Sequence, residues 1–262
     1  MQTILDRIVA STRQSVARAK ATVPPAELQE LLAEAPPPRD FHAALTAGWE
    51  VRLIAEVKRA SPSAGLIRED FDPVEIAATY QANGAACISV LTDEPFFQGH
   101  LDYLRKIRAE VDLPLLRKDF IVDSYQLLEA RQAGADCVLL IAECLTPSEL
   151  KRLHNEAEGL GMQTLIELYD VENLDAVLET GTRLVGVNNR DLRTFETDLN
   201  HTLRLRELIP TDRLVVGESG IRSSSDVATL GRAGIKAILV GESLMRQPDI
   251  GLAVRNLIGG QR

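Results

Sequence analysis

The chain has 262 residues, of which 45% are hydrophobic, and its formal net charge at pH 7 is −9. The length fits one large domain, and the hydrophobic fraction is sufficient for a sizeable core without disulfides or metal. The acidic balance argues against a general nucleic-acid-binding protein, since a phosphate backbone favours a basic surface, but it allows one local basic pocket for a small anion.

The sequence carries no signal for export or membrane insertion. No apolar run approaches the roughly 20 residues that span a bilayer, and the N-terminus has no apolar signal segment. The three cysteines, Cys87, Cys137 and Cys144, form no CxxC pair. This pattern is typical of a reducing cytosol, so we expect a cytoplasmic protein with no membrane partner.

Residues 1–48 are predicted to form a helical extension. Helical patterns run near 3–20, 26–34 and 40–47, with proline breakers between them. Two interpretations stay open. The extension either only caps one end of the fold, or part of it also covers the ligand.

From residue 51 onward, short β-branched apolar runs alternate with amphipathic helical stretches, the last of them near 249–258. The predicted strands are 51–58, 85–92, 114–120, 137–143, 163–168, 184–190, 214–220 and 237–243. Strands that alternate with helices indicate a parallel sheet, and eight units favour a closed barrel over an open sheet. The predicted fold is therefore an α/β fold, a (β/α)8 TIM barrel. We expect one domain over residues 1–262, of which 1–48 is the extension.

Two local patterns mark the predicted helix boundaries. Glycine recurs where a helix should end before a strand, at Gly84, Gly134, Gly181 and Gly234, because glycine adopts the left-handed conformation at little cost. Residues 146–149 read TPSE. This string predicts a threonine N-cap, a proline at the first helical position and a capping-box acid.

Five of the predicted strands end in polar residues. In barrels of this kind the chemistry lies at the carboxyl ends of the strands. With a period of two, Glu56 and Lys58 point to the same side of the first strand. The other polar ends are 117–119, Glu167, 188–190 and 218–220. Because a buried charge is costly unless it is paired, this convergence of ammonium groups, carboxylates and an amide predicts a functional site at the barrel mouth.

The last two strands end in similar segments, VGESG at 216–220 and VGES at 240–243. Barrels often bind phosphate with the loops after these strands and the N-terminus of a short extra helix. The expected main-chain donors are Gly220, Gly241 and the amide of Glu242, although both glycines are also compatible with tight turns alone. The glutamate side chains would repel phosphate, so we expect them to point away from it.

The loop after the first strand, 59–72, is longer than the two to six residues usual for such loops. This length is typical of a lid or a binding loop. Within it, Ser61 and Ser63 offer hydroxyl groups on either side of the rigid Pro62.

Aromatic residues form only 4% of the chain, so three phenylalanines near strand ends stand out: Phe96, Phe97 and Phe120. They either wall a flat apolar ligand or only pack loops together. Both interpretations stay open.

The sequence lacks the usual metal and nucleophile motifs. Its four histidines show no HExxH or paired spacing, and neither GxSxG nor a P-loop is present. We therefore expect no metal and no cofactor.

The polar segments match a known family. Residues 56–63 read EVKRASPS, which resembles the ExKxxSPS signature of indole-3-glycerol phosphate synthases. The resemblance continues through 116–120, 165–167, 186–192, 217–221 and 240–245, and it extends over about residues 1–258. It implies a carboxy-lyase of tryptophan biosynthesis that needs no metal or cofactor. Its substrate would be 1-(2-carboxyphenylamino)-1-deoxy-D-ribulose 5-phosphate, and its products indole-3-glycerol phosphate, carbon dioxide and water.

The implied chemistry assigns roles to the charged residues. The arene carbon that bears the carboxylate attacks the ribulose C2 carbonyl, whose oxygen needs a proton donor. The resemblance gives this role to Lys118, and we expect partial burial near a second lysine to lower its pKa. Glu167 would be the general base and Glu56 the partner of a lysine. Lys58 would hold the substrate carboxylate or phosphate and donate a proton in the later dehydration.

The resemblance implies further site residues. Asn188 would orient a hydroxyl or carboxylate group, and Arg190 and Ser219 would help fix the phosphate. The expected substrate and phosphate contacts are Ser61, Pro62, Phe120, Arg190, Gly220, Leu239, Gly241 and Glu242.

Two other functions stay open. Another phosphate-binding barrel enzyme, such as a phosphoribosylanthranilate isomerase, would share the phosphate segments but not the 56–63 string. A non-catalytic barrel that binds a phosphorylated ligand would have lost its acid and base groups. The expected partner is a small phosphorylated substrate and not a nucleic acid, and a monomer is favoured.

Overall fold

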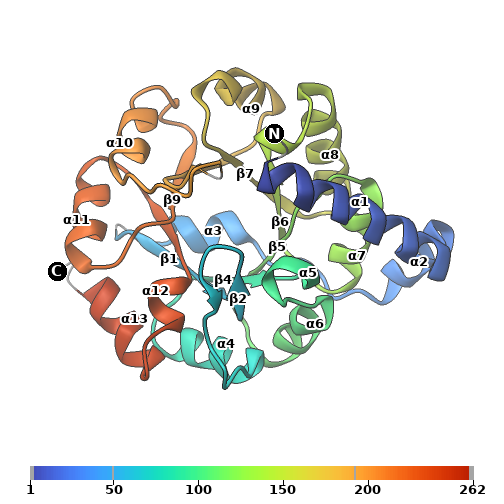
Figure 1. The fold of residues 1–262 in the computed structure, drawn as a ribbon, viewed down its shortest axis with the longest axis horizontal. Coiled ribbons are helices and arrows are strands. Elements are labelled where there is room, and N and C mark those ends of the chain that lie inside the picture. The colour runs from blue at the N-terminus through green and yellow to red at the C-terminus, as the bar shows by residue number, and fades with distance from the viewer. Residues whose placement is uncertain (1–2, 49, 192, 260–262) are drawn as a thin grey trace.

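The computed structural model describes residues 3–48, 50–191 and 193–259. Eight parallel strands lie at its centre: β1 (Arg52–Val57), β4 (Cys87–Leu91), β5 (Leu115–Lys118), β6 (Cys137–Ile141), β7 (Gln163–Leu168), β8 (Leu184–Asn188), β9 (Leu214–Glu218) and β10 (Ala237–Val240). They form a closed barrel in the order β1, β10, β9, β8, β7, β6, β5, β4, which returns to β1 (Figure 1). The predicted (β/α)8 barrel is confirmed.

Helices surround the strands (Figure 1). The outer ring consists of α4 (Pro73–Ala82), α6 (Leu101–Glu110), α7 (Ser124–Gln132), α8 (Pro147–Gly159), α9 (Leu174–Thr180), α10 (Asn200–Arg206), α11 (Ser224–Arg232) and α13 (Ile250–Ile258). In β1, Leu53 and Val57 belong to the hydrophobic cluster shared with these helices, whereas Ile54 belongs to the cluster inside the barrel. The strands are therefore covered on both sides, which is why most of their residues are apolar and their polar residues gather near the strand ends.

The N-terminal extension reaches both ends of the barrel. It contains α1 (Ile4–Thr22), α2 (Pro25–Glu30), the 3-10 helix η1 (Leu31–Glu34) and α3 (Phe41–Thr46). In α3, Phe41 and Leu45 pack into the interior cluster, and the His42 backbone N–H donates to Gln163 at the start of β7 (2.8 Å). Figure 1 draws α1, in dark blue, in front of the strands. The extension thus caps the amino-terminal end of the barrel with α3 and leaves α1 at the mouth.

The predicted helix boundaries agree with the backbone. Gly84, Gly134, Gly181 and Gly234 all have positive φ, between 82° and 101°. Thr146 is the N-cap of α8, and its side chain and that of Glu149 form the reciprocal pair of a capping box. Among the described residues, no helix is long and apolar enough to cross a bilayer.

Several predicted strands end early, and one loop contains structure that was not predicted. The strands expected at 184–190, 214–220 and 237–243 end at Asn188, Glu218 and Val240. The strand expected at 114–120 ends at Lys118, because the chain turns out of the ladder at Asp119. The loop 59–72 contains a small antiparallel hairpin of β2 (Ala60–Ser61) and β3 (Gly65–Leu66), which lies in front of the strands in Figure 1. Two-residue strands are too short to show a period in the sequence.

A buried ion pair attaches the extension to the amino-terminal end of the barrel. The Asp136 carboxylate, which precedes β6, pairs with Arg108 of α6 at 2.9 Å, and the Asp136 side chain is fully buried. It also accepts the backbone N–H groups of Arg39 (2.6 Å) and Leu115 (2.7 Å). Arg108 in turn donates to the carbonyl of Pro37 (2.6 Å). One carboxylate therefore joins the extension, α6 and β5.

Asp136→Asn is expected to lower the free energy of unfolding by about 3–5 kcal/mol, because the buried Arg108 guanidinium loses its counter-charge. Urea unfolding followed by circular dichroism measures the change. Asp70→Asn is the control. Asp70 pairs with Arg68 at the surface and is 82% exposed, so this substitution should change stability little. An equal, small effect of both substitutions would contradict the role assigned to Asp136.

Candidate active site

A cavity of about 570 Å³ opens at the carboxyl end of the barrel. Ile4, Leu5 and Ile8 of α1 line one part of it, and strand ends and loops line the rest. Of the residues predicted for the site, the cavity brings together Glu56, Lys58, Ser61, Pro62, Lys118, Phe120, Glu167, Arg190, Ser219, Gly220, Leu239, Gly241 and Glu242. Asn188 is the predicted residue that does not line it. Leu192, the last residue of the 186–192 string, lies outside the described residues.

Two lysines enter the cavity from different strands, each paired with carboxylates. Lys118 Nζ, at the end of β5, lies 3.0 Å from Glu167 Oε2 of β7 and 3.5 Å from Glu218 Oε2 of β9. Lys58 Nζ lies 2.6 Å from Glu56 Oε1 of β1. The Lys118 side chain is 16% exposed, whereas those of Glu167 and Glu218 are only 3% exposed. A deeply buried acid–base cluster therefore forms the floor of the cavity.

The prediction of a lowered pKa for Lys118 is wrong. Burial does act to lower this pKa, but the carboxylates of Glu167, Glu218 and Glu56 outweigh it, and the pKa of Lys118 is raised. The second lysine, Lys58, is compensated by its own carboxylate at 2.6 Å. Lys118 is therefore a stable ammonium group in the free protein.

Two carboxylates share the Lys118 ammonium, and their pKa values move apart. Burial raises the pKa of Glu167, but Lys118 and the hydrogen bonds to Glu167 more than offset this, so the pKa is lowered. Burial and the neighbouring Glu167 raise the pKa of Glu218 well above its usual value, against the effect of Lys118. Glu218 Oε1 is also buried without a hydrogen-bond partner. The pKa values of the two neighbouring carboxylates are thus shifted in opposite directions.

Asn188 holds Glu167 in place. Its Nδ2 donates to Glu167 Oε1 at 2.9 Å, and its Oδ1 accepts the backbone N–H of Arg190 at 2.9 Å. Both ends of the amide are therefore engaged within the protein. These contacts hold the Glu167 carboxylate in the cluster, whereas the family resemblance implied that Asn188 orients a hydroxyl or carboxylate group.

Glycine makes room for two of the glutamates. A Cβ atom at Gly186 of β8 would collide with Glu218 Oε1, and one at Gly241 would collide with Glu56 Oε1. Gly241 was predicted only as a main-chain donor. Its position beside Glu56 gives a second reason for glycine there.

The loops after β8, β9 and β10 form a basic, glycine-containing side of the cavity. Ser219 and Gly220 have left-handed φ values of 65° and 77°, a conformation in which successive N–H groups can face an anion. The short helix α12 (Glu242–Met245) begins directly after β10, and the first N–H groups of a helix have no partner within it. The basic side chains that line the cavity besides the two lysines are Arg190, Arg222 and Arg246.

Both glutamates near this region were expected to point away from it, and only Glu218 does so, since Glu242 pairs with basic side chains of the region itself. Glu218 faces Lys118 inside the barrel. Glu242 pairs with Arg246 at 3.0 Å and lies 4.0 Å from Arg190. Arg190 also donates to Ser63 Oγ at 3.0 Å, which links the loop after β8 to the hairpin after β1.

The aromatic residues divide between the two interpretations. The ring centroids of Phe97 and Phe120 lie 6.1 Å apart, and both rings line the cavity. Phe96 packs against the interior cluster and is not part of the lining. Phe97 and Phe120 therefore form an aromatic wall, while Phe96 packs the loop.

Several lining residues were not predicted for the site. Glu218 was recognised as a polar strand end, but its inward direction follows from the period of two that also places Val216 in the interior cluster. Arg222 and Arg246 belong to loops whose paths no local pattern specifies. Among the described residues, no group of three or more His, Cys, Asp or Glu side chains could hold a metal ion.

Comparisons with known proteins agree along the whole chain. The family model described as indole-3-glycerol phosphate synthase matches residues 5–257. A protein of that name from Rhodopirellula baltica is 68% identical over 256 residues, which cover 98% of this chain and 99% of that protein. Another from an Azoarcus species is 50% identical over 265 residues and covers 99% and 100% of the two chains.

Solved structures with much lower identity share the architecture. The 3-hexulose-6-phosphate synthase from Salmonella typhimurium aligns with a TM-score of 0.66 at 14% identity, over 80% of this chain and 98% of that one. KGPDC from Streptococcus mutans aligns with a TM-score of 0.62 at 15% identity, over 80% and 97%. These two matches support the barrel fold alone. The family match and the full-length relatives show more: this chain belongs to the indole-3-glycerol phosphate synthase family.

Proposed function

We propose that the protein is a carboxy-lyase of the reducing cytoplasm that closes the indole ring in tryptophan biosynthesis. It would convert 1-(2-carboxyphenylamino)-1-deoxy-D-ribulose 5-phosphate into indole-3-glycerol phosphate, carbon dioxide and water. The observation that carries the proposal is the buried contact of Lys118 with Glu167 and Glu218 on the floor of a cavity. It supports acid–base chemistry on a bound ligand, and membership of the family supports the reaction.

Charge and shape give the substrate one favoured orientation. The phosphate would bind on the basic side, to main-chain N–H groups near Gly220 and Glu242 and to Arg190, with Ser219 beside them. The flat aminobenzoate ring would lie against Phe97 and Phe120. Lys58, which also lines the cavity, would hold the ring carboxylate until it leaves as carbon dioxide.

In this orientation Lys118 would face the ribulose C2 carbonyl. Its ammonium would stabilise the charge that develops on the carbonyl oxygen as the arene carbon attacks, and then protonate that oxygen. A pKa raised in the free protein keeps Lys118 charged before binding. Loss of carbon dioxide restores the aromaticity of the benzene ring. Glu167, held by Asn188, would accept the proton that the ribulose C1 carbon loses as water leaves, which forms the double bond of the new five-membered ring.

The dehydration step needs a second proton donor, because the former carbonyl oxygen departs as water. The candidate donors are Glu218, whose pKa is raised, and Lys58, and one of them would supply this proton. The enzyme would contribute mainly positioning and proton transfer, because the decarboxylation proceeds once the ring carbon is tetrahedral.

The direct test is to incubate the purified protein with the carboxyphenylamino substrate and follow indole-3-glycerol phosphate by fluorescence and carbon dioxide by release. Both products should appear in equal amounts, without added metal or cofactor. Phosphoribosylanthranilate is tested in parallel. Isomerisation of that compound without turnover of the first would favour the isomerase, and ligand-induced stabilisation with no turnover of either would favour a binding protein.

Lys118→Ala is expected to lower kcat by roughly 10²–10⁴-fold, because it removes the proposed general acid. Inhibition by inorganic phosphate should persist, since the proposed phosphate site contains other residues. Steady-state kinetics measures both quantities. Lys106→Ala, an exposed lysine of α6, is the control and should match the wild type. An effect of Lys118→Ala on KM alone would contradict the assigned role.

Gly186→Ala is expected to lower kcat by roughly 10²-fold, because the new Cβ atom displaces the Glu218 carboxylate from Lys118. Gly159→Ala is the matched control, since a Cβ atom there meets nothing within 4 Å. Turnover and thermal unfolding are measured on both variants. Wild-type kcat in folded Gly186→Ala would show that the position of Glu218 does not matter for the reaction.

A further inference from the structure

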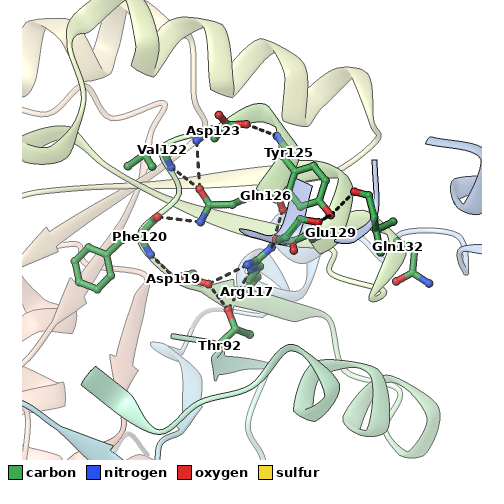
Figure 2. Close-up of polar contacts among 12 residues, drawn as sticks. Thr92, Arg117, Asp119, Phe120, Val122, Asp123, Tyr125, Gln126, Glu129 and Gln132 are labelled. Atoms are coloured by element: carbon green, nitrogen blue, oxygen red, sulfur yellow. Dashed lines mark hydrogen bonds and ion pairs between the residues drawn. The ribbon is translucent and has the colours of Figure 1, made fainter. Parts of the chain in front are cut away.

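A buried polar network lies directly behind the aromatic wall. It consists of Thr92 after β4, Arg117 in β5, Asp119 after β5, and Gln126 in α7, and we refer to these four residues as the Arg117 network (Figure 2). All four are less than 9% exposed. Thr92, Arg117 and Gln126 are absent from the cavity lining. The proposed chemistry uses none of the four.

An ion pair and a shared hydroxyl join three members of the network. Arg117 contacts Asp119 at 3.0 Å through its NH2 group, and its Nε donates to Thr92 Oγ1 at 3.1 Å. The Thr92 hydroxyl in turn donates to Asp119 Oδ2 at 2.5 Å. Arg117 also donates to the backbone carbonyl of Gln126 at 2.7 Å. Burial acts to lower the pKa of Arg117, but the carboxylates of Asp119 and Glu129 raise it, so Arg117 stays charged.

Both peptide groups that flank the Phe120 Cα atom are held by this network. The Phe120 N–H donates to Asp119 Oδ1 at 2.8 Å, and the Phe120 carbonyl accepts from Gln126 Nε2 at 3.1 Å. Gln126 Oε1 also accepts the N–H groups of Val122 (2.9 Å) and Asp123 (3.2 Å). Figure 2 shows these contacts around the turn, with the Phe120 ring projecting away from them. The turn that carries the ring is therefore fixed by side chains on both sides.

The opposite half of the wall is held in a similar way. Asp93 accepts the N–H groups of Phe96 (2.8 Å) and Phe97 (3.2 Å) and caps α5 (Glu94–Phe97). Burial raises the pKa of Asp93 to about 6, and Asp119 adds to this. Two buried aspartates at adjacent strand ends thus each fix the backbone of one wall residue.

A buried ion pair gives little net stability compared with apolar packing, but it can specify one conformation. We propose that the Arg117 network positions Phe120, and thereby sets the affinity of the enzyme for the aromatic part of its substrate. The inference rests on the proposed function. It makes Thr92, Arg117, Asp119 and Gln126 positioning residues that act through Phe120.

The test uses two variants outside the cavity lining. Gln126→Met removes the donor to the Phe120 carbonyl with little change of volume, and Thr92→Val removes the shared hydroxyl as a milder change. Each should raise KM for the carboxyphenylamino substrate, with Gln126→Met reaching roughly 3- to 10-fold, the effect of one lost aromatic contact. The inhibition constant of inorganic phosphate and kcat should stay near the wild-type values, because neither the phosphate side nor Lys118 is touched.

Two controls separate positioning from loss of stability. Asp136→Asn breaks a buried Arg–Asp pair at the opposite end of the barrel and should leave KM unchanged in the folded protein. In a Phe120→Ala background, Gln126→Met should raise KM no further, because residues that act through one another are not additive. Thermal unfolding establishes that each variant is folded under the assay conditions.

The outcomes distinguish the two proposals. Absence of wild-type turnover would overturn the proposed function and this inference with it. With an active wild type, unchanged KM in both folded variants would overturn the inference alone. So would a full additional effect in the Phe120→Ala background, a parallel loss of phosphate affinity, or an equal rise of KM in Asp136→Asn.

Discussion

The site depends on one buried ammonium group that two carboxylates share. Lys118 cannot lie on the barrel floor unpaired, because burial penalises an isolated charge. Glu167 and Glu218 supply the pairing, yet together they carry one negative charge too many for it. The protein resolves this excess by raising the pKa of Glu218 while that of Glu167 is lowered. A proton donor and a proton acceptor therefore arise side by side from the same type of side chain.

The alternation of strand residues places this cluster and its support on opposite sides of β5. Lys118 enters the cavity, while Arg117 reaches the backbone of α7 outside the barrel. Strand β5 thus separates the charge of Lys118, which lies in the cavity, from the charge of Arg117, which helps to fix the turn at Phe120. Strand β8, which lies between β7 and β9, supports the cluster from within the barrel, since Gly186 leaves space for Glu218 and Asn188 holds Glu167.

The repeated strands and helices of this protein could be predicted from its sequence. Contacts between side chains that lie far apart along the chain could not. Eight apolar runs with glycine-terminated helices indicated the closed barrel, because both signals repeat along the chain. Lys118 and Glu167 were found as polar strand ends. The pKa of Lys118 was predicted in the wrong direction, because it depends on which carboxylates lie within about 4 Å, and Glu218 comes from a strand far along the chain. The partner of Asn188 required coordinates for the same reason.

The distribution of charge in the cavity also constrains how a phosphorylated ligand can enter. A phosphate group is repelled by the carboxylates of Glu56 and Glu167 on the floor and attracted to the side where Arg222 and Arg246 line the cavity. The opposite side, with the aromatic wall and the apolar face of α1, favours an uncharged ring. A substrate with a phosphate at one end and a ring at the other then has one favourable orientation in the cavity. In the proposed orientation, the ketone between them would be brought to Lys118 because both ends are already fixed.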